Sequence, residues 1–163
     1  MKDYSFNNLL EKHQELLEVI IRSYNEYAHL HGRQLSYGTD ETFSLAQIQV
    51  IETVLRGKEN NMKALATDLG ITKGSLTKNI KKLESRGLVK RYKYPENKKE
   101  VYVEVTPRGE ELYSQYADFI YEHLFHKVYS KFDELSDENL NKIKEAFMIT
   151  NQFMEKMTQG EES

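Results

Sequence analysis

The clearest pattern of apolar and polar residues lies near the middle of the chain. Leu65, Ala66 and Leu69 recur at the spacing of one helical face, which predicts a short helix. Asn61 stands where a helix N-cap is expected, because its side chain can accept a hydrogen bond from the first turn. Gly70 marks the end of this helix, since glycine enters the left-handed conformation at little cost.

A second helical pattern follows after one tight turn. Its apolar residues are Leu76, Ile80 and Leu83, spaced four and three apart, so they form one buried face. Thr72 is placed to cap the start of this helix, and Gly87 to end it. The opposite face is polar and basic. The two patterns together predict a helix-turn-helix.

Two strand-like runs come next, at residues 88–94 and 100–106. In the second run apolar and polar residues alternate, which is the period of a strand with one buried face. Residues 95–99 are expected to form the loop of a β-hairpin. A helix-turn-helix followed by such a hairpin is the arrangement of a winged helix-turn-helix. The buried positions of the second run are Val101, Val103 and Val105.

Longer helical patterns flank this central part. Residues 6–30 and 107–132 each predict one long helix, and the last helix is expected from Ser136 to about residue 157. Residues 32–43 read as a loop. Between that loop and the helix-turn-helix, a helix is predicted from Ser44 to Gly57. Ser44 and Gln47 can form a capping box at its start.

Charge changes the picture of the central helix. Between Thr72 and Lys99 there are ten Lys or Arg residues against two acids, a net charge of +8, whereas the whole chain carries −3. Basic charge concentrated in one module of an acidic protein indicates a polyanionic partner. The alternative is a helical hairpin whose lysines are merely solvated.

Several short motifs, in this order, resemble the MarR family of transcriptional regulators. They are Leu65-Ala66, Leu69-Gly70-Ile71, the run from Leu83 to Val89, and the run from Val105 to Gly109. The resemblance covers nearly the full chain and implies a mainly α-helical fold with a small β-wing. Where such proteins carry Asp-x-Arg at the wing tip, this chain has Asn97-Lys98-Lys99. In such proteins the arginine enters the minor groove. Lysine lacks the planar fork of arginine, so from this wing we expect phosphate contact rather than minor-groove reading.

The resemblance also implies a function, namely a sequence-specific regulator that binds a pseudo-palindromic operator in double-stranded DNA as a homodimer, acting as a ligand-responsive repressor. A helix in the major groove presents small polar and basic side chains to base edges and phosphates. Base-edge or flanking contacts are expected from Thr72, Lys73, Ser75, Leu76, Lys78 and Asn79. Phosphate contacts are expected from Lys81, Lys82, Arg91, Lys98 and Lys99. A winged helix that binds another protein is the alternative.

The first and last helices carry apolar stripes that suit a second subunit. The resemblance implies one domain over residues 1–163, with a DNA-binding lobe at 44–106 and dimerisation helices at 6–31 and 107–157. The alternative is that the last helix packs on the first helix of its own chain. The stripe of the first helix contains Phe6, Leu10, Leu17, Ile20, Tyr24 and Tyr27. The heptad-like stripe of the last helix contains Leu140, Ile143, Phe147, Thr150, Met154 and Met157.

Aromatic and histidine residues raise the question of small ligands. The resemblance implies that Tyr24, Tyr27, Tyr113 and Tyr116 line an effector pocket, and core packing is the alternative. His123 and His126, three apart on a helix, are candidates for a metal site because some relatives sense zinc. The alternative is that these are ordinary helix residues with no metal.

Composition excludes several classes of protein. Without cysteine there is no disulfide and no thiolate metal site. No glycine-rich phosphate loop or nucleophile motif indicates an enzyme, and no cofactor is expected. An apolar run long enough to span a membrane and a signal-peptide core are both lacking, so we expect a soluble, cytoplasmic protein.

Overall fold

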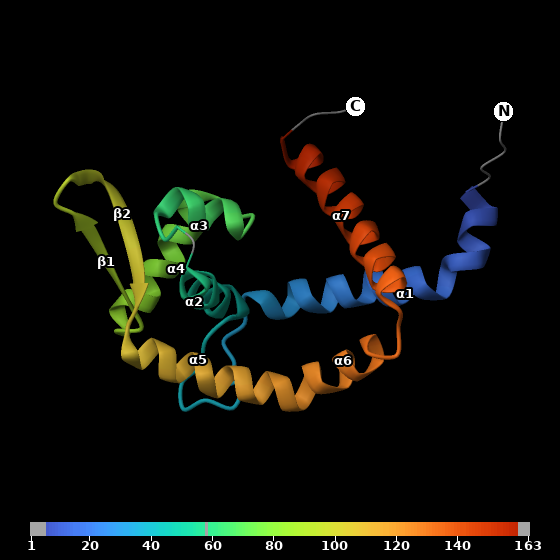
Figure 1. Cartoon of the computed structure of the whole chain (residues 1–163), viewed down its shortest axis with the longest axis horizontal. Helices are drawn as coiled ribbons and strands as arrows, with labels where there is room; N and C mark the ends of the chain where they lie inside the picture. Colours follow the sequence, from blue (N-terminus) through green and yellow to red (C-terminus); the bar gives the residue numbers. More distant parts are fainter. Residues whose placement is uncertain (1–5, 58, 160–163) are drawn as a thin grey trace. The chain divides into compact units, whose positions relative to one another are not determined.

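The computed structural model describes residues 6–57 and 59–159 (Figure 1). It contains two compact units, one ending at Ala117 and the other beginning at Asp118. The described residues are mostly helical and contain a two-stranded antiparallel sheet, so the predicted mainly α fold with a small β-wing is confirmed. The elements are α1 (Phe6–His31), α2 (Leu45–Arg56), α3 (Met62–Asp68), α4 (Lys73–Ser85), β1 (Val89–Tyr94), β2 (Asn97–Val105), α5 (Pro107–Ile120), η1 (Tyr121–Phe125), α6 (His126–Phe132) and α7 (Asp137–Gln159).

Local capping explains where the central helices begin. The Ser44 backbone N–H donates to Gln47 Oε1 at 2.9 Å and the Ser44 hydroxyl oxygen accepts from the Gln47 N–H, which is the predicted capping box of α2. Asn61 Oδ1 accepts from two backbone N–H groups of α3, and Thr72 Oγ1 accepts from Ser75 at 3.2 Å. These hydrogen bonds satisfy N–H groups that have no partner within the helix.

The ends of α3 and α4 also follow the sequence. Gly70 has φ 62° and Gly87 has φ 69°, so each adopts the left-handed conformation in which a side chain would be strained. The backbone N–H of Gly87 donates to Glu84 O at 2.9 Å and that of Leu88 to Leu83 O at 3.0 Å. The helix therefore closes its own end before β1 begins.

One apolar core joins α2, α3, α4, the hairpin and the start of α5. It extends past the predicted lobe at residues 44–106 in both directions, because Phe43 and Leu112 are buried in it and Tyr116 packs against it. Burying such side chains supplies most of the free energy that holds a small domain together. The fully buried members include Ile48, Ile51, Leu65, Leu76, Ile80, Leu83, Leu88 and Val103.

The hairpin is longer and its turn tighter than predicted. Strands β1 and β2 pair from Val89 with Val105 to Tyr94 with Asn97, so the prediction of a loop at residues 95–99 is wrong. The turn is only Pro95-Glu96. Asn97 continues the ladder as the partner of Tyr94, and Asn97 Nδ2 donates to Glu100 Oε2 at 2.9 Å. Figure 1 shows the hairpin extending beside α3 and α4.

The helix after the wing is interrupted. Residues 107–132 are helical throughout, but η1 is a turn of π-helix between α5 and α6. At its start, Thr106 Oγ1 donates to Gly87 O at 2.6 Å and accepts the Gly109 N–H at 3.1 Å. The first turn of α5 is thereby tied to the end of the helix-turn-helix.

The second unit carries an uncovered apolar stripe on α7. Phe147 is 43% exposed, and Met154 and Met157 are each more than half exposed. On α1, Leu16, Val19 and Ile21 are also more than half exposed, while Phe6 and Leu10 lie outside the described side chains.

No helix in the described ranges is both long and apolar enough to cross a membrane.

Candidate nucleic-acid interface

Helix α4 has one buried and one exposed face. Leu76, Ile80 and Leu83 are fully buried in the core. Ser75 and Lys78 lie on the opposite, exposed face. The prediction that Leu76 contacts DNA is therefore wrong, because a side chain with 0% exposure packs against the rest of the domain and cannot reach a base edge. The other exposed residues predicted for this helix are Thr72, Lys73, Lys81 and Lys82.

Two of the predicted residues are less free than their neighbours. Asn79 is half-buried and so is less accessible than Ser75 and Lys78. The Thr72 oxygen accepts the capping hydrogen bond from Ser75, which leaves its hydroxyl proton for a second partner. The exposed side of the first two turns of α4 still presents hydroxyl, amide and ammonium groups together, the chemistry that reads base edges and phosphates.

The wing supplies free and paired cations. Lys98 and Lys99 are exposed, and neither forms an ion pair within the described ranges. Arg91 instead donates to Glu84 on α4, with Nε to Oε2 at 3.0 Å. This hydrogen bond raises the pKa of Arg91 and lowers the pKa of Glu84. Arg91 therefore holds β1 on α4, and its charge is largely balanced within the protein.

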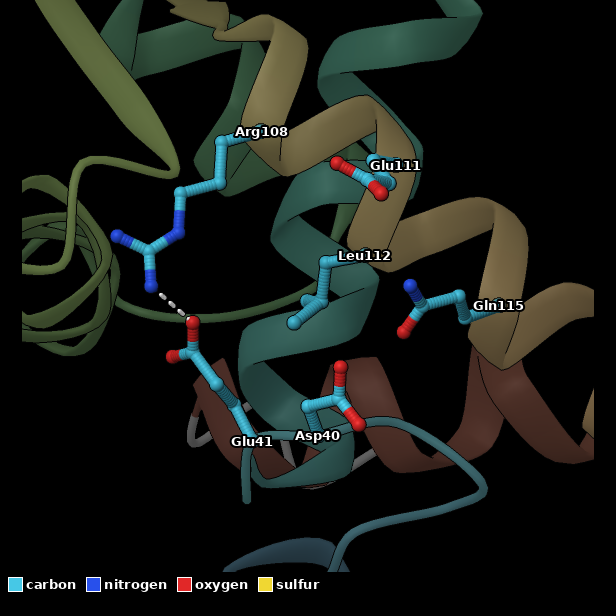
Figure 2. Close-up of a pocket in the computed structure, with 6 residues that line it drawn as sticks. All are labelled: Asp40, Glu41, Arg108, Glu111, Leu112 and Gln115. Carbon is cyan, nitrogen blue, oxygen red and sulfur yellow. Dashed lines mark hydrogen bonds and ion pairs between the residues drawn. The ribbon is translucent and has the colours of Figure 1, made fainter.

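An ion-pair cluster that no sequence pattern indicates lies at the other end of α4. Glu41 Oε2 accepts from Arg86 Nη2 at 2.6 Å and from Arg86 Nε at 3.1 Å. Its second oxygen accepts from Arg108 at the start of α5. Figure 2 shows Glu41 and Arg108 pointing toward one another. Both belong to the lining of a hollow of about 390 Å³, together with Asp40, Glu111, Leu112 and Gln115. Glu41 thus connects the loop before α2 to both helices.

We expect Glu41→Gln to flatten the acid side of the stability curve. The bonds from Arg86 and then Arg108 hold the pKa of Glu41 below its ordinary value of 4.5. A carboxylate with a lowered folded pKa stabilises the fold above that ordinary value, and the contribution disappears as the pH falls through the folded pKa. The free energy of unfolding of the variant should be lower than that of the wild type by about 1 kcal/mol near neutral pH, since Glu41 is partly shielded from solvent. Below about pH 3 the two proteins should differ little.

Urea unfolding between pH 3 and pH 7 measures this effect. Glu138→Gln is the matched control, because Glu138 pairs with Lys142 on α7 where both side chains are well exposed. If Glu41→Gln and Glu138→Gln give the same pH dependence, the Glu41 cluster contributes nothing to stability.

The predicted effector tyrosines are only partly brought together. Tyr113 and Tyr116 lie on α5 with ring centroids 6.2 Å apart, and burial raises the pKa of Tyr116 to about 12. The Tyr27 hydroxyl accepts from Gln49 at 2.6 Å, and Tyr24 is 38% exposed on α1. Tyr37, which the sequence does not single out, stacks on Phe43 and packs edge-on against Tyr116, and its buried hydroxyl has no partner among the described residues.

The two candidate metal ligands are engaged separately. His123 Nδ1 lies 2.8 Å from Phe119 O, and its ring stacks on Phe119. His126 packs edge-on against Tyr121. Within residues 6–57 and 59–159, no group of three or more His, Asp or Glu side chains gathers at metal-binding distance. The described part of one chain therefore holds no ligand set for His123 or His126 to complete.

Comparison with known proteins agrees with this geometry. Residues 43–101 match the model of the MarR family. The chain is 25% identical over 144 residues to YhjH, an uncharacterised HTH-type transcriptional regulator of Bacillus subtilis (strain 168), with 85% of this chain and 81% of that protein covered.

Solved structures share the fold at low identity. The zinc-responsive MarR family member ZitR of Lactococcus lactis superposes with a TM-score of 0.63 at 16% identity, covering 86% of this chain and 98% of ZitR. Streptococcus pneumoniae FabT, solved in complex with DNA, gives a TM-score of 0.59 at 20% identity, covering 90% and 98%. The described part of this chain thus has a winged helix-turn-helix fold, and its residues 43–101 match the MarR family.

Proposed function

We propose that this protein is a sequence-specific DNA-binding transcriptional regulator. The observation that carries the proposal is the exposed face of α4, where Ser75 and Lys78 lie away from a fully buried apolar face and the half-buried Asn79 lies at the edge between the two. A helix held in this way can enter the major groove, and the lysines of α4 and the wing can neutralise phosphates on either side. FabT, which has the same fold, is solved with DNA, and this supports the proposal.

The regulator acts as a homodimer on a pseudo-palindromic operator. The support is the exposed apolar stripe of α7 and the exposed apolar residues of α1, since contiguous apolar surface of this kind marks an interface. A two-fold dimer places two recognition helices in successive major grooves, so the operator should mirror that symmetry. Selection of bound sequences from random duplex DNA tests both points: a two-fold symmetric motif supports them, and the absence of any enriched sequence contradicts sequence-specific binding.

Regulation as a ligand-responsive repressor is the remaining part of the proposal. The aromatic cluster of Tyr37, Phe43 and Tyr116 lies where the loop before α2 and α5 meet the core of the DNA-binding part. The Tyr37 hydroxyl, which has no partner in the described part of the chain, suits a phenolic or anionic ligand that supplies a hydrogen-bond partner. Such a ligand changes DNA affinity only if it binds the DNA-competent conformation with a different affinity from the other conformation.

Replacing both Lys78 and Asn79 with Ala should weaken operator binding much more than binding to random DNA. Base-edge contacts are worth about 1–3 kcal/mol for each good pair and carry the sequence information. Affinities for the selected motif and for a scrambled duplex, measured at the same salt concentration, give the comparison.

The matched control is the double replacement of Lys81 and Lys82 with Ala. These exposed lysines lie further along α4 and are expected to contact phosphates. Their loss should weaken both duplexes by similar factors. Equal losses on both duplexes for the Lys78 and Asn79 variant would mean that these two residues do not read bases.

A further inference from the structure

A cleft of about 260 Å³ lies where α3, α4 and the wing meet. Each of the three elements contributes one lysine to its lining: Lys63 from the first turn of α3, Lys73 from the first residue of α4, and Lys99 from β2. Lys63 precedes the basic segment that begins at Thr72, so no sequence pattern indicates it as a binding residue. The other lining residues are Asn61, Met62, Glu100 and Val101.

The charges in this cleft are not balanced by the protein. Lys63, Lys73 and Lys99 are exposed, and the described ion pairs of the chain include none of them. Among the described lining residues the acid is Glu100, whose Oε2 accepts from Asn97 Nδ2 at 2.9 Å and from the Tyr102 hydroxyl at 2.8 Å. Three ammonium groups against one engaged carboxylate leave a net positive charge that attracts an anion.

The backbones that carry the three lysines are held in place relative to one another. The Lys63 N–H donates to Asn61 Oδ1 at 3.0 Å, so the cap of α3 positions that residue. Strand β2 is bound to the same segment, since the Val103 N–H donates to Asn60 O at 2.9 Å. Lys73 follows directly on Thr72, the cap of α4. The backbone frame of the cleft is therefore in place before any ligand arrives, which reduces the cost of binding.

We propose that one phosphate group of the DNA backbone is seated in this cleft and is contacted by Lys63, Lys73 and Lys99 together. This inference rests on the proposed function and adds a binding residue, Lys63, and a geometry. A phosphodiester oxygen pair is a compact anion that several ammonium groups can share. Through that phosphate the wing and both helices of the helix-turn-helix are fastened to the same point on the duplex, without an arginine at the wing tip.

The salt dependence of DNA binding tests the sharing. Each phosphate that a protein neutralises contributes about 0.9 to the slope of log K against log salt on B-DNA. In a short random-sequence duplex titrated by fluorescence anisotropy, the triple variant Lys63→Gln, Lys73→Gln and Lys99→Gln should lose about one unit of slope. Three lysines on three separate phosphates would instead cost about three units, and that result overturns the shared site.

Single variants assign the role of Lys63. Lys63→Gln should reduce affinity several-fold at low salt, Lys63→Arg should keep most of the affinity, and Lys142→Gln should have no effect. Lys142 is the matched control because it is an exposed lysine on α7, outside the winged helix-turn-helix. Thermal melting of each variant confirms that the fold is retained. If Lys63→Gln binds DNA like Lys142→Gln, the proposed site is wrong.

Two further arms separate this inference from its alternatives. Wild-type protein that binds no duplex DNA at low salt would overturn the proposed function itself, whereas wild-type binding with an inert Lys63 overturns only the phosphate site. Inorganic phosphate is the second probe, compared with chloride at equal ionic strength by amide chemical shifts of the free protein. Lys63-dependent binding of inorganic phosphate, together with DNA binding that is unchanged in Lys63→Gln, would assign the cleft to a free phosphate and overturn the DNA assignment.

Discussion

Gly109→Ala is expected to destabilise the winged helix-turn-helix by about 3 kcal/mol or more. A Cβ at position 109 would lie 2.1 Å from Leu88 O and 2.7 Å from Val105 Cγ1. The Leu88 backbone cannot move cheaply, because Leu88 O accepts the Thr106 N–H at 3.0 Å and Leu88 itself is fully buried. The added methyl group therefore forces apart α5 and the base of the hairpin.

The same substitution at Gly74 serves as the control. Gly74 lies inside α4, is exposed, and a Cβ there would have Thr72 Oγ1 as its nearest neighbour at 3.9 Å. Gly74→Ala should stabilise the protein by about 0.5–1 kcal/mol, because alanine restricts the unfolded chain and favours a helix. Urea unfolding of both variants gives the two free energies. A Gly109→Ala protein with the wild-type midpoint would show that the base of the hairpin accommodates the methyl group.

Phe147→Asp is expected to dissociate the proposed homodimer and to abolish tight operator binding. Phe147 is 43% exposed in the single chain and belongs to the apolar stripe of α7, so the charge costs little in an isolated subunit. In a dimer that buries this stripe, an unpaired carboxylate loses its hydration at a cost of several kcal/mol. Operator affinity falls as well, although no DNA-contacting residue has changed, because two linked recognition helices bind far more tightly than one.

Sedimentation and the concentration dependence of the melting temperature measure the effect. Gln152→Asp is the matched control: it adds a carboxylate to the same helix, five residues along and so about 140° around from Phe147. The control should sediment as the wild type does. A wild-type protein that remains a folded monomer at micromolar concentration would contradict the dimer, and the exposed stripe of α7 would then need another explanation.

Much of the local structure follows from the sequence. The capping box of Ser44 and Gln47, and the caps at Asn61 and Thr72, are hydrogen bonds between residues two or three positions apart. The buried face of α4 likewise depends only on residues close together in the chain, because the helical period determines it. That period also places Leu76 on the buried face. The prediction that Leu76 contacts DNA is therefore inconsistent with the helical pattern, and the structure shows that Leu76 is buried. The family resemblance, which rests on short motifs in order, predicts the fold class correctly.

The turn of the wing shows the limit of such patterns. Alternation of apolar residues locates two strands but does not determine where their pairing stops. The polar residues near the tip of a hairpin can either lie in the loop or continue the strand pairing, and the pattern does not distinguish the two. Here the ladder reaches Asn97, whose side chain donates to Glu100, and the loop shrinks to two residues.

Contacts between residues far apart in the chain were decided by the tertiary structure alone. Glu41 meets Arg86 and Arg108 at separations of 45 and 67 residues. Arg91 forms an ion pair with Glu84, and the close approach of Leu88 requires glycine at position 109. Local periodicity carries no information on which exposed charges face one another, because that depends on how the helices and the hairpin pack around the core. For the same physical reason, the cleft lined by Lys63, Lys73 and Lys99 exists only in the folded chain.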